Sequence, residues 1–356
     1  MENDNLKTRP DVFETSADVS ELSPDVLESK PEAKKSKSKI VLGFLSVFLI
    51  AVFIFAFLNY VAIKDYFVGL SFKPTAEMSE IKEKLELTDR GSLIFNASFP
   101  TLESKDDFNR DCDSYDEEIS VLGCFSKDRI YVYNITSSEL SGILESTTAH
   151  ELLHAIWSRL KGAEKAALTP VLEDVYKENR LMLEETLATY SESDRLDELY
   201  VRVGTQVSSL PEELETHYKK YFNNRANVVS FYESYVAPFN ELNEKIKAEE
   251  KELAALKEEA DALSKTYEEE ADEFNKAVGE FNACASRENC YTEAEFYSRR
   301  AELVAEEKKL DEMYSELEAK IKEYNSKVEE YNKNVIKSNG LQEIINSNSA
   351  PSEIEE

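Results

Sequence analysis

The chain has 356 residues, with 42 lysines and arginines against 72 aspartates and glutamates, so its formal net charge is −30. A field of this sign repels phosphate backbones and argues against a nucleic-acid partner. Hydrophobic residues make up 42% of the chain and aromatic residues 10%, which is enough for a folded core. The length suits two or three modules, since domains usually contain roughly 100 to 200 residues.

The N-terminal part contains one long apolar stretch, residues 40–63, without a charged side chain. About 20 apolar residues cross a hydrocarbon core of roughly 30 Å as a helix, so we expect a transmembrane helix that contacts the lipid bilayer here. Residues 1–39 are polar and are predicted to form a disordered tail. Lysines 34, 35, 37 and 39 place this tail in the cytoplasm by the positive-inside rule. The rest is then expected outside a cell membrane that the chain crosses once, in an extracellular or periplasmic space.

Four cysteines form two pairs that are close in sequence, Cys112 with Cys124 and Cys284 with Cys290. An even number of cysteines on the oxidising side of a membrane favours disulfides within each pair. A four-thiolate zinc site would need Cys-x-x-Cys spacing, which neither pair has. Free thiols are the remaining alternative.

Residues 64–239 are predicted to form an α+β domain, with a small sheet and several helices. Runs of β-branched and aromatic residues predict strands at 92–99, 119–125 and 129–135. Helical spacing of apolar residues predicts helices at 76–87, 140–160, 170–190, 196–203 and 211–222. The residues Asp89, Arg90 and Gly91 are expected to end the first helix.

Residues 240–338 change in composition to glutamate, lysine and alanine, with apolar residues that alternate in steps of three and four. Two such segments flank the short stretch between Cys284 and Cys290. A connection this short predicts an antiparallel coiled-coil hairpin. Two separate helices of a globular bundle are the alternative. Residues 339–356 are expected to be a disordered tail.

The segment from His150 to His154 has the sequence His-Glu-Leu-Leu-His inside a predicted helix. Positions i and i+4 lie on the same face of a helix, so both imidazoles can bind one Zn²⁺ while Glu151 projects beside them. A zinc ion lowers the pKa of a bound water to about 7, and Glu151 as general base can take its proton during attack on a carbonyl carbon. Two histidines without a metal are the alternative.

This motif resembles that of the zincin metallopeptidases, in particular the gluzincin-like group, in which a downstream glutamate completes the zinc site. The resemblance implies a catalytic domain of a sheet and helices over about residues 76–239. It also implies an edge strand before the motif helix that binds an extended peptide, a role that residues 129–135 can fill by strand addition. It does not extend to the coiled coil.

The third zinc ligand is predicted to be Glu198, which lies in a helical segment that begins with an acidic pair, Asp197 and Glu198. The family often has Asn-Glu at this place, whereas this chain has Asp-Glu, and the distance from His154 along the chain is longer than in well-known members. Glu184 and Glu185 are also candidates for the third ligand. Both fit a solvated acidic helix face as well, which is common in a chain this acidic.

The only other histidine, His217, is expected to help catalysis by donating a hydrogen bond to the oxyanion that forms during attack. It is also a candidate third ligand, or an ordinary histidine without a role. Tyr218 and Arg225 are nearby candidates for the same electrostatic role.

Two functions remain open from sequence. The first is a membrane-anchored zinc peptidase that acts on a protein or peptide substrate, with the coiled-coil arm available to a protein partner. The second is a non-catalytic cell-envelope scaffold that acts through the hairpin. The presence of Glu151 favours the enzyme, because a scaffold does not need the general base.

Overall fold

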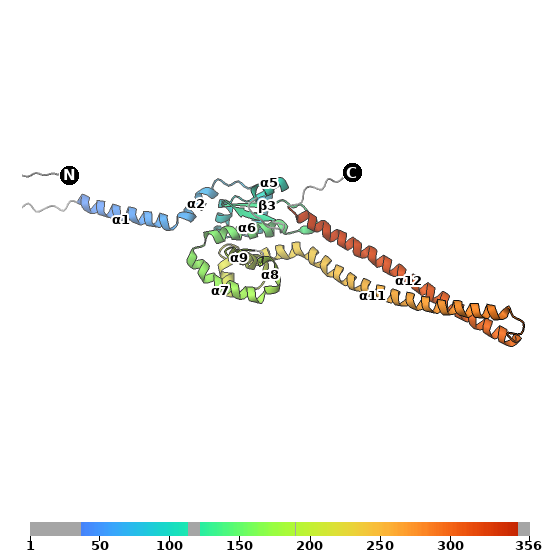
Figure 1. Cartoon of the computed structure of the whole chain (residues 1–356). Coiled ribbons are helices and arrows are strands. Elements are labelled where there is room, and N and C mark those ends of the chain that lie inside the picture. The colour runs from blue at the N-terminus through green and yellow to red at the C-terminus, as the bar shows by residue number, and fades with distance from the viewer. Residues whose placement is uncertain (1–36, 113–121, 189, 348–356) are drawn as a thin grey trace, which may run out of the picture. The chain divides into compact units, whose positions relative to one another are not determined.

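The computed structural model describes residues 37–112, 122–188 and 190–347 (Figure 1). The chain divides into two compact units, residues 1–58 and 59–356. In the first unit, the described part is helix α1 (Lys37–Leu58). From Leu42 onward its side chains are apolar or small and almost all exposed. The predicted tail over residues 1–36 lies outside the described residues.

The helix predicted over residues 40–63 is two helices, because α1 ends at Leu58 and α2 (Tyr60–Gly69) begins after Asn59. Within the described ranges, no single helix is long and apolar enough to cross a membrane. Residues 42–58 and α2 meet that requirement only when they are counted together as a broken pair.

The second unit begins with helices α2, α3 (Ala76–Lys84) and α4 (Asp89–Ala97). The side chains of Thr75 and Thr88 accept hydrogen bonds from the backbone N–H groups of Met78 and Gly91 and so cap α3 and α4. The prediction of a strand at 92–99 is therefore wrong. The residues that were expected to end the first helix form the first turn of α4 instead.

Among the described residues, the sheet has three strands, β1 (Thr101–Glu103), β2 (Gly123–Ser126) and β3 (Arg129–Tyr133), in the order β1-β3-β2. Strand β1 runs parallel to β3, and β2 runs antiparallel to it. The strand at β3 was predicted, but its place at an edge is wrong, because it is bonded on both sides. Strand β2 occupies an edge. Residues 119–121 of the predicted second strand lie outside the described part.

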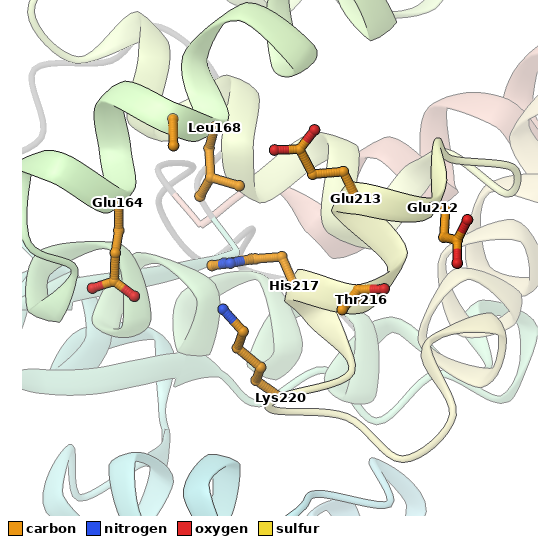
Figure 2. Close-up of a pocket in the computed structure, with 8 residues that line it drawn as sticks. Glu164, Leu168, Glu212, Glu213, Thr216, His217 and Lys220 are labelled. Carbon is orange, nitrogen blue, oxygen red and sulfur yellow. The ribbon is translucent and has the colours of Figure 1, made fainter.

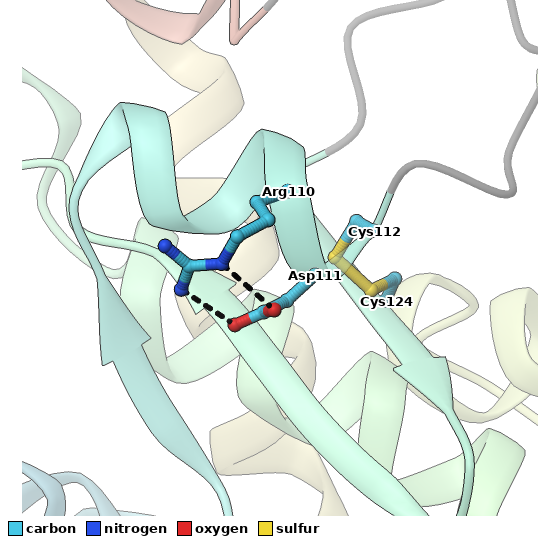
Figure 3. The surroundings of a disulfide bond; sticks show 4 residues. All are labelled: Arg110, Asp111, Cys112 and Cys124. Carbon is cyan, nitrogen blue, oxygen red and sulfur yellow. Dashed lines mark hydrogen bonds and ion pairs between the residues drawn. A yellow bond between two sulfur atoms is a disulfide. The ribbon is translucent and has the colours of Figure 1, made fainter.

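Both predicted disulfides are present. Cys112 follows α5 (Lys105–Asp111) and is bonded to Cys124 in β2, with 6.1 Å between their Cα atoms (Figure 3). Together with Phe108 these two cysteines form a small buried cluster, against which Tyr131 and Tyr133 of β3 pack. The Cys284–Cys290 bond closes the connection between the two long helices.

Helix α6 lies at the centre of the second unit and is buried on most of its surface. Its neighbours include β2, β3, α9 and the start of α11. The helices of this part are α6 (Ile143–Arg159), α7 (Gly162–Glu178), α8 (Arg180–Leu187), α9 (Arg195–Gln206) and α10 (Glu212–Tyr218), after a 3-10 turn at Ser138–Leu140. The segment predicted as one helix at 170–190 belongs to α7 and α8, with Pro170 inside α7.

The long helices α11 (Arg225–Ala285) and α12 (Glu293–Ile345) lie side by side as a hairpin (Figure 1). Ion pairs such as Lys327 with Glu252 cross between them. Helix α11 begins earlier than the predicted boundary at 240, and Val228 joins the core of the second unit. Helix α12 continues beyond 338, and Leu341 is 3% exposed. The tail predicted at 339–356 is thus partly wrong, while residues 348–356 lie outside the described part.

We expect the two disulfides to differ in their effect on the second unit. Replacing Cys112 and Cys124 by serine should lower the free energy of unfolding by about 3 kcal/mol, because the bond closes a loop of moderate length in the unfolded chain. Urea unfolding followed by the fluorescence of Trp157, the single tryptophan of the chain and part of α6, measures this change.

The matched control replaces Cys284 and Cys290 by serine at the exposed end of the hairpin. This double variant should change the Trp157 transition by less than half as much. Equal decreases in the free energy of unfolding for the two double variants would contradict the prediction that the Cys112–Cys124 bond stabilises the part around Trp157 more than the Cys284–Cys290 bond does.

Candidate metal centre

Two helices bring three possible metal ligands together. His150 and His154 lie one turn apart on α6, and their Nε2 atoms are 3.3 Å apart. Helix α9 packs against α6 and directs Glu198 at both rings. The Oε2 atom of Glu198 lies 3.3 Å from Nε2 of His154 and 3.7 Å from Nε2 of His150. The structure therefore brings Glu198, the predicted third ligand, next to both histidines of the motif.

These distances match the dimensions of a tetrahedral zinc site. Ligand atoms about 2.0 to 2.2 Å from a zinc ion in tetrahedral geometry are separated from each other by about 3.4 Å. The carboxylate of Glu198 is 1% exposed, and neither of its oxygens forms a hydrogen bond of acceptable geometry with the described residues. A buried carboxylate usually has such partners or binds a metal. The three side chains therefore fit a zinc ion.

Two further side chains hold the ligands in place. Asp197 lies with Oδ1 at 2.9 Å from Nδ1 of His154, a contact that turns Nε2 toward the cluster. Arg202 lies one turn after Glu198 on α9, and its Nε is 2.5 Å from Oε1 of Glu198. Neither role was predicted from the sequence. The adjacent acidic pair and the spacing of four residues from Glu198 to Arg202 were the available signals.

The pKa directions in this cluster follow from burial and mutual attraction. Burial lowers the pKa of His150 to about 3, so this ring is neutral, as a metal ligand must be. Burial opposes ionisation of Glu198, but the neighbouring histidines and Arg202 outweigh it and lower its pKa. Burial would also lower the pKa of His154, but the neighbouring carboxylates of Asp197 and Glu198 raise it to about 10. A proton on His154 thus supplies positive charge to the two carboxylates, and a bound cation would replace it.

Glu151, the predicted general base, is 4% exposed and lines the same cavity as the three possible ligands. The cavity has a volume of about 320 Å³. On one side it is bounded by Gly123 at the start of edge strand β2. A Cβ atom at this glycine would lie 2.9 Å from Oε1 of Glu151 and 2.7 Å from the Thr147 side chain. The strand can lie this close to α6 because position 123 has no side chain.

The hairpin also contributes to the cavity lining. Tyr232 and Tyr235 come from the first turns of α11, and Ile345 is the last residue of α12. Burial raises the pKa of Tyr235 to about 12, so its hydroxyl group keeps its proton at neutral pH. The expected division into a catalytic domain ending at 239 and a separate hairpin therefore does not describe the site, because both long helices help to line it.

His217 lies outside this cavity. Its Nε2 is 3.0 Å from the hydroxyl of Tyr200, and its ring packs against Tyr218 and Tyr221. Figure 2 shows the ring pointing into a different pocket, beside Glu164 and Lys220. The structure thus brings His217 neither to the ligands nor to Glu151. The roles expected for it, at the oxyanion or as a third ligand, have no geometric support.

Tyr218 and Arg225, the neighbouring candidates for the oxyanion, also have structural roles. The buried Tyr218 hydroxyl donates to the backbone carbonyl of Tyr200. Arg225 is 4% exposed, pairs with Glu215 and donates to backbone carbonyls at the end of α9. Both side chains therefore stabilise the packing around α9 and lie away from the cavity.

Glu184, a candidate third ligand, belongs to α8. It accepts hydrogen bonds from Tyr176 and Arg180 and is not part of the cluster around the two histidines. The side chain of Glu185 lies outside the described residues.

Comparisons of the chain with protein family models, with curated proteins and with solved structures each found no match. Its function is therefore inferred from the geometry and chemistry of the described residues.

The position of His217 predicts a structural phenotype for His217→Asn. Loss of the bond to the buried Tyr200 hydroxyl should lower the free energy of unfolding by about 1 to 3 kcal/mol, while zinc content stays unchanged. Urea unfolding followed by Trp157 fluorescence and metal analysis measure the two effects. Loss of zinc from a folded His217→Asn protein would contradict the placement of this ring.

The burial of His217 also predicts how the free energy of unfolding depends on pH. Burial lowers the pKa of His217 to about 4, below its usual value of 6.5, so the unfolded chain binds a proton between these pH values that the folded chain does not. Stability should fall as the pH drops from 6.5 to 4, and the fall should be shallower in His217→Asn.

Proposed function

We propose that the chain is a membrane-anchored, zinc-dependent peptidase that hydrolyses peptide bonds outside the cytoplasmic membrane. The observation that supports this most is the cluster of three donor atoms at zinc-site distances in a cavity that also contains Glu151. The proposal keeps the resemblance of the motif to the zincin metallopeptidases. His150, His154 and Glu198 would hold the metal.

A zinc ion held there would act as a Lewis acid and lower the pKa of water at its open coordination position to about 7. Glu151 follows His150 directly in α6 and faces the same cavity. Its carboxylate accepts the proton of the attacking water and can return it to the amine that leaves. Asp197 keeps the His154 ring oriented, and Arg202 does the same for the carboxylate of Glu198.

Strand β2 takes the substrate-binding role that was predicted for residues 129–135. It is an edge strand, and its first residues, Gly123 and Cys124, line the cavity beside Glu151. An extended peptide that pairs with a free strand edge presents its backbone in a regular register. Such pairing would place a peptide bond of the substrate next to Glu151, and it would not require a particular side chain in the substrate.

Tyrosines that line the cavity replace His217 as candidates for the oxyanion. Tyr190, Tyr232 and Tyr235 each carry a hydroxyl that can donate a hydrogen bond, and Tyr235 holds its proton well above neutral pH. Arg202 is less suited to this task because it already pairs with Glu198.

The membrane part of the proposal depends on residues 42–58, which carry exposed apolar side chains without a charge. The lysines that precede this stretch favour a cytoplasmic N-terminus. Both disulfides lie after it, and disulfides persist in oxidising compartments outside the cytoplasm. Charge and cysteine chemistry therefore agree on the side of the membrane.

Two substitutions in the full chain test the enzymatic proposal. Glu151→Gln should retain about one zinc per chain and lose hydrolysis of a peptide mixture by about 10²- to 10⁴-fold, because the amide cannot accept a proton. Glu198→Gln should lose most of its zinc as well as activity. Metal analysis and a cleavage assay on the same samples measure both.

Glu184→Gln is the matched control, because Glu184 lies on a neighbouring helix and bonds Tyr176 and Arg180. It should keep both zinc and activity. Undiminished cleavage by Glu151→Gln would refute the mechanism. Wild-type protein that binds zinc and cleaves no peptide would favour a non-catalytic scaffold, in which the hairpin acts on a protein partner.

Close packing of β2 on the general base leads to a separate prediction for Gly123→Ala. The added methyl group would displace Glu151 or the strand, since a Cβ at this position has no room. We expect activity to fall on the order of 10²-fold while zinc is retained. Gly162→Ala, where a Cβ would meet nothing within 4 Å, is the control and should behave as wild type. Equal activity of the two variants would show that Gly123 does not position Glu151.

A further inference from the structure

Helix α2 presents a continuous apolar face that the described residues of the second unit leave largely exposed. At about 100° per residue, its outward half carries only aliphatic and aromatic side chains apart from a lysine at its margin. These residues are Tyr60, Ile63, Tyr66, Phe67 and Leu70. Phe67 is 67% exposed and Leu70 is 65% exposed. Burying such side chains is favourable, so a face of this kind indicates a binding surface.

The opposite side of α2 packs against the rest of the second unit and forms hydrogen bonds with it. Asp65 is 4% exposed and forms two hydrogen bonds with Arg159 in the last turn of α6, at 2.8 and 3.1 Å. Gly69 packs closely against α4, where an added Cβ would lie 3.2 Å from Cβ of Asn96. Lys64 pairs with Asp128 in the turn between β2 and β3. Helix α2 is therefore part of the folded domain and not a free linker.

We propose that the outward face of α2 lies in the interfacial region of a lipid bilayer, parallel to its surface. The inference rests on the membrane anchor of the proposed function. Only Asn59 separates α2 from α1, whose side chains from Leu42 are apolar or small and almost all exposed. Tyrosine is also enriched where hydrocarbon meets water, and this face carries Tyr60 and Tyr66.

The buried Asp65–Arg159 ion pair favours an interfacial position of α2 over a position inside the transmembrane segment. A helix that carried α2 into the hydrocarbon core would have to take Asp65 with it, away from Arg159, and a charged side chain in hydrocarbon without its partner is unfavourable. In the interface, Asp65 stays inside the domain while the opposite face enters the acyl-chain boundary. A bilayer thus accommodates both the exposed side chains of α1 and the half-exposed α2.

The attraction would be apolar rather than electrostatic. The chain as a whole carries a net charge of −30, which opposes binding to anionic lipid. The lysine at the margin of the face, Lys64, already has Asp128 as its partner. Neutral lipid should therefore suffice.

The Asp65–Arg159 pair gives this contact a consequence for the site. Arg159 ends the helix that carries His150, Glu151 and His154. A bilayer that holds α2 therefore also holds the motif helix in a defined orientation to the membrane surface, through two charge-assisted hydrogen bonds.

The test uses full-length chain reconstituted into phosphatidylcholine vesicles, with a tryptophan introduced at Phe67. Lipids brominated near the headgroup end of their acyl chains quench tryptophan at that depth. We expect them to remove roughly half of the emission that Phe67→Trp adds to that of Trp157, because an interfacial helix buries its apolar face at the acyl boundary. Leu181→Trp, at a fully exposed apolar position on α8, is the matched control and should lose almost none.

Flotation of the same vesicles separates the failure of this inference from failure of the anchor. If the protein floats with the lipid but Phe67→Trp is not quenched, α2 is in water or against a protein, and the interfacial position is refuted while the anchor stands. Equal quenching at Leu181 would also refute it, since the contact would not be specific to this face. If the protein does not float, the anchor and the interfacial helix both fail, and zinc content and cleavage still report separately on the enzyme.

Discussion

The second unit depends on the neutralisation of one buried carboxylate between two helices. Glu198 is 1% exposed on α9 and meets His150 and His154 of α6 at distances of 3.7 and 3.3 Å. A buried charge without partners costs several kcal/mol, so the packing of α9 on α6 at this distance requires positive charge next to Glu198. Arg202, a proton on His154 or a metal ion can supply it. Packing of the two helices and assembly of the candidate metal centre are therefore one event.

The cavity beside α6 and α9 is lined by residues from several other elements. Edge strand β2 approaches Glu151 where Gly123 has no side chain, and the first turns of α11 add Tyr232 and Tyr235. Ile345, the last residue of α12, also lines the cavity, so both ends of the hairpin contribute to it. A change in how the base of the hairpin packs would alter the shape of the cavity directly. The hairpin and the candidate centre are thus physically coupled, whether the arm binds a partner or serves as a support.

Errors in the predicted fold have a common physical origin. Residues 92–99 contain aliphatic and aromatic side chains typical of a strand, but the Thr88 cap and packing within the domain make residues 92–97 part of helix α4. Strand β1 has only three residues, too few for a periodic signal. The order β1-β3-β2 follows from long-range pairing, so the edge strand was assigned to the wrong segment. His217 was given a catalytic role because histidines are scarce, but burial beside Tyr200 is a property of the folded core.

Local sequence was sufficient where the relevant interactions are local. The spacing of His150 and His154, the two short disulfide loops and the apolar repeat of the hairpin each act over a few turns or residues, and the structure contains all of them. Tertiary structure alone decided which of many carboxylates faces the two rings, which strand lies at the sheet edge beside Glu151, and which face of α2 the other described residues leave exposed. These outcomes depend on how segments that are distant in sequence pack against each other and pair their buried charges. A local pattern of neighbouring residues does not contain that information.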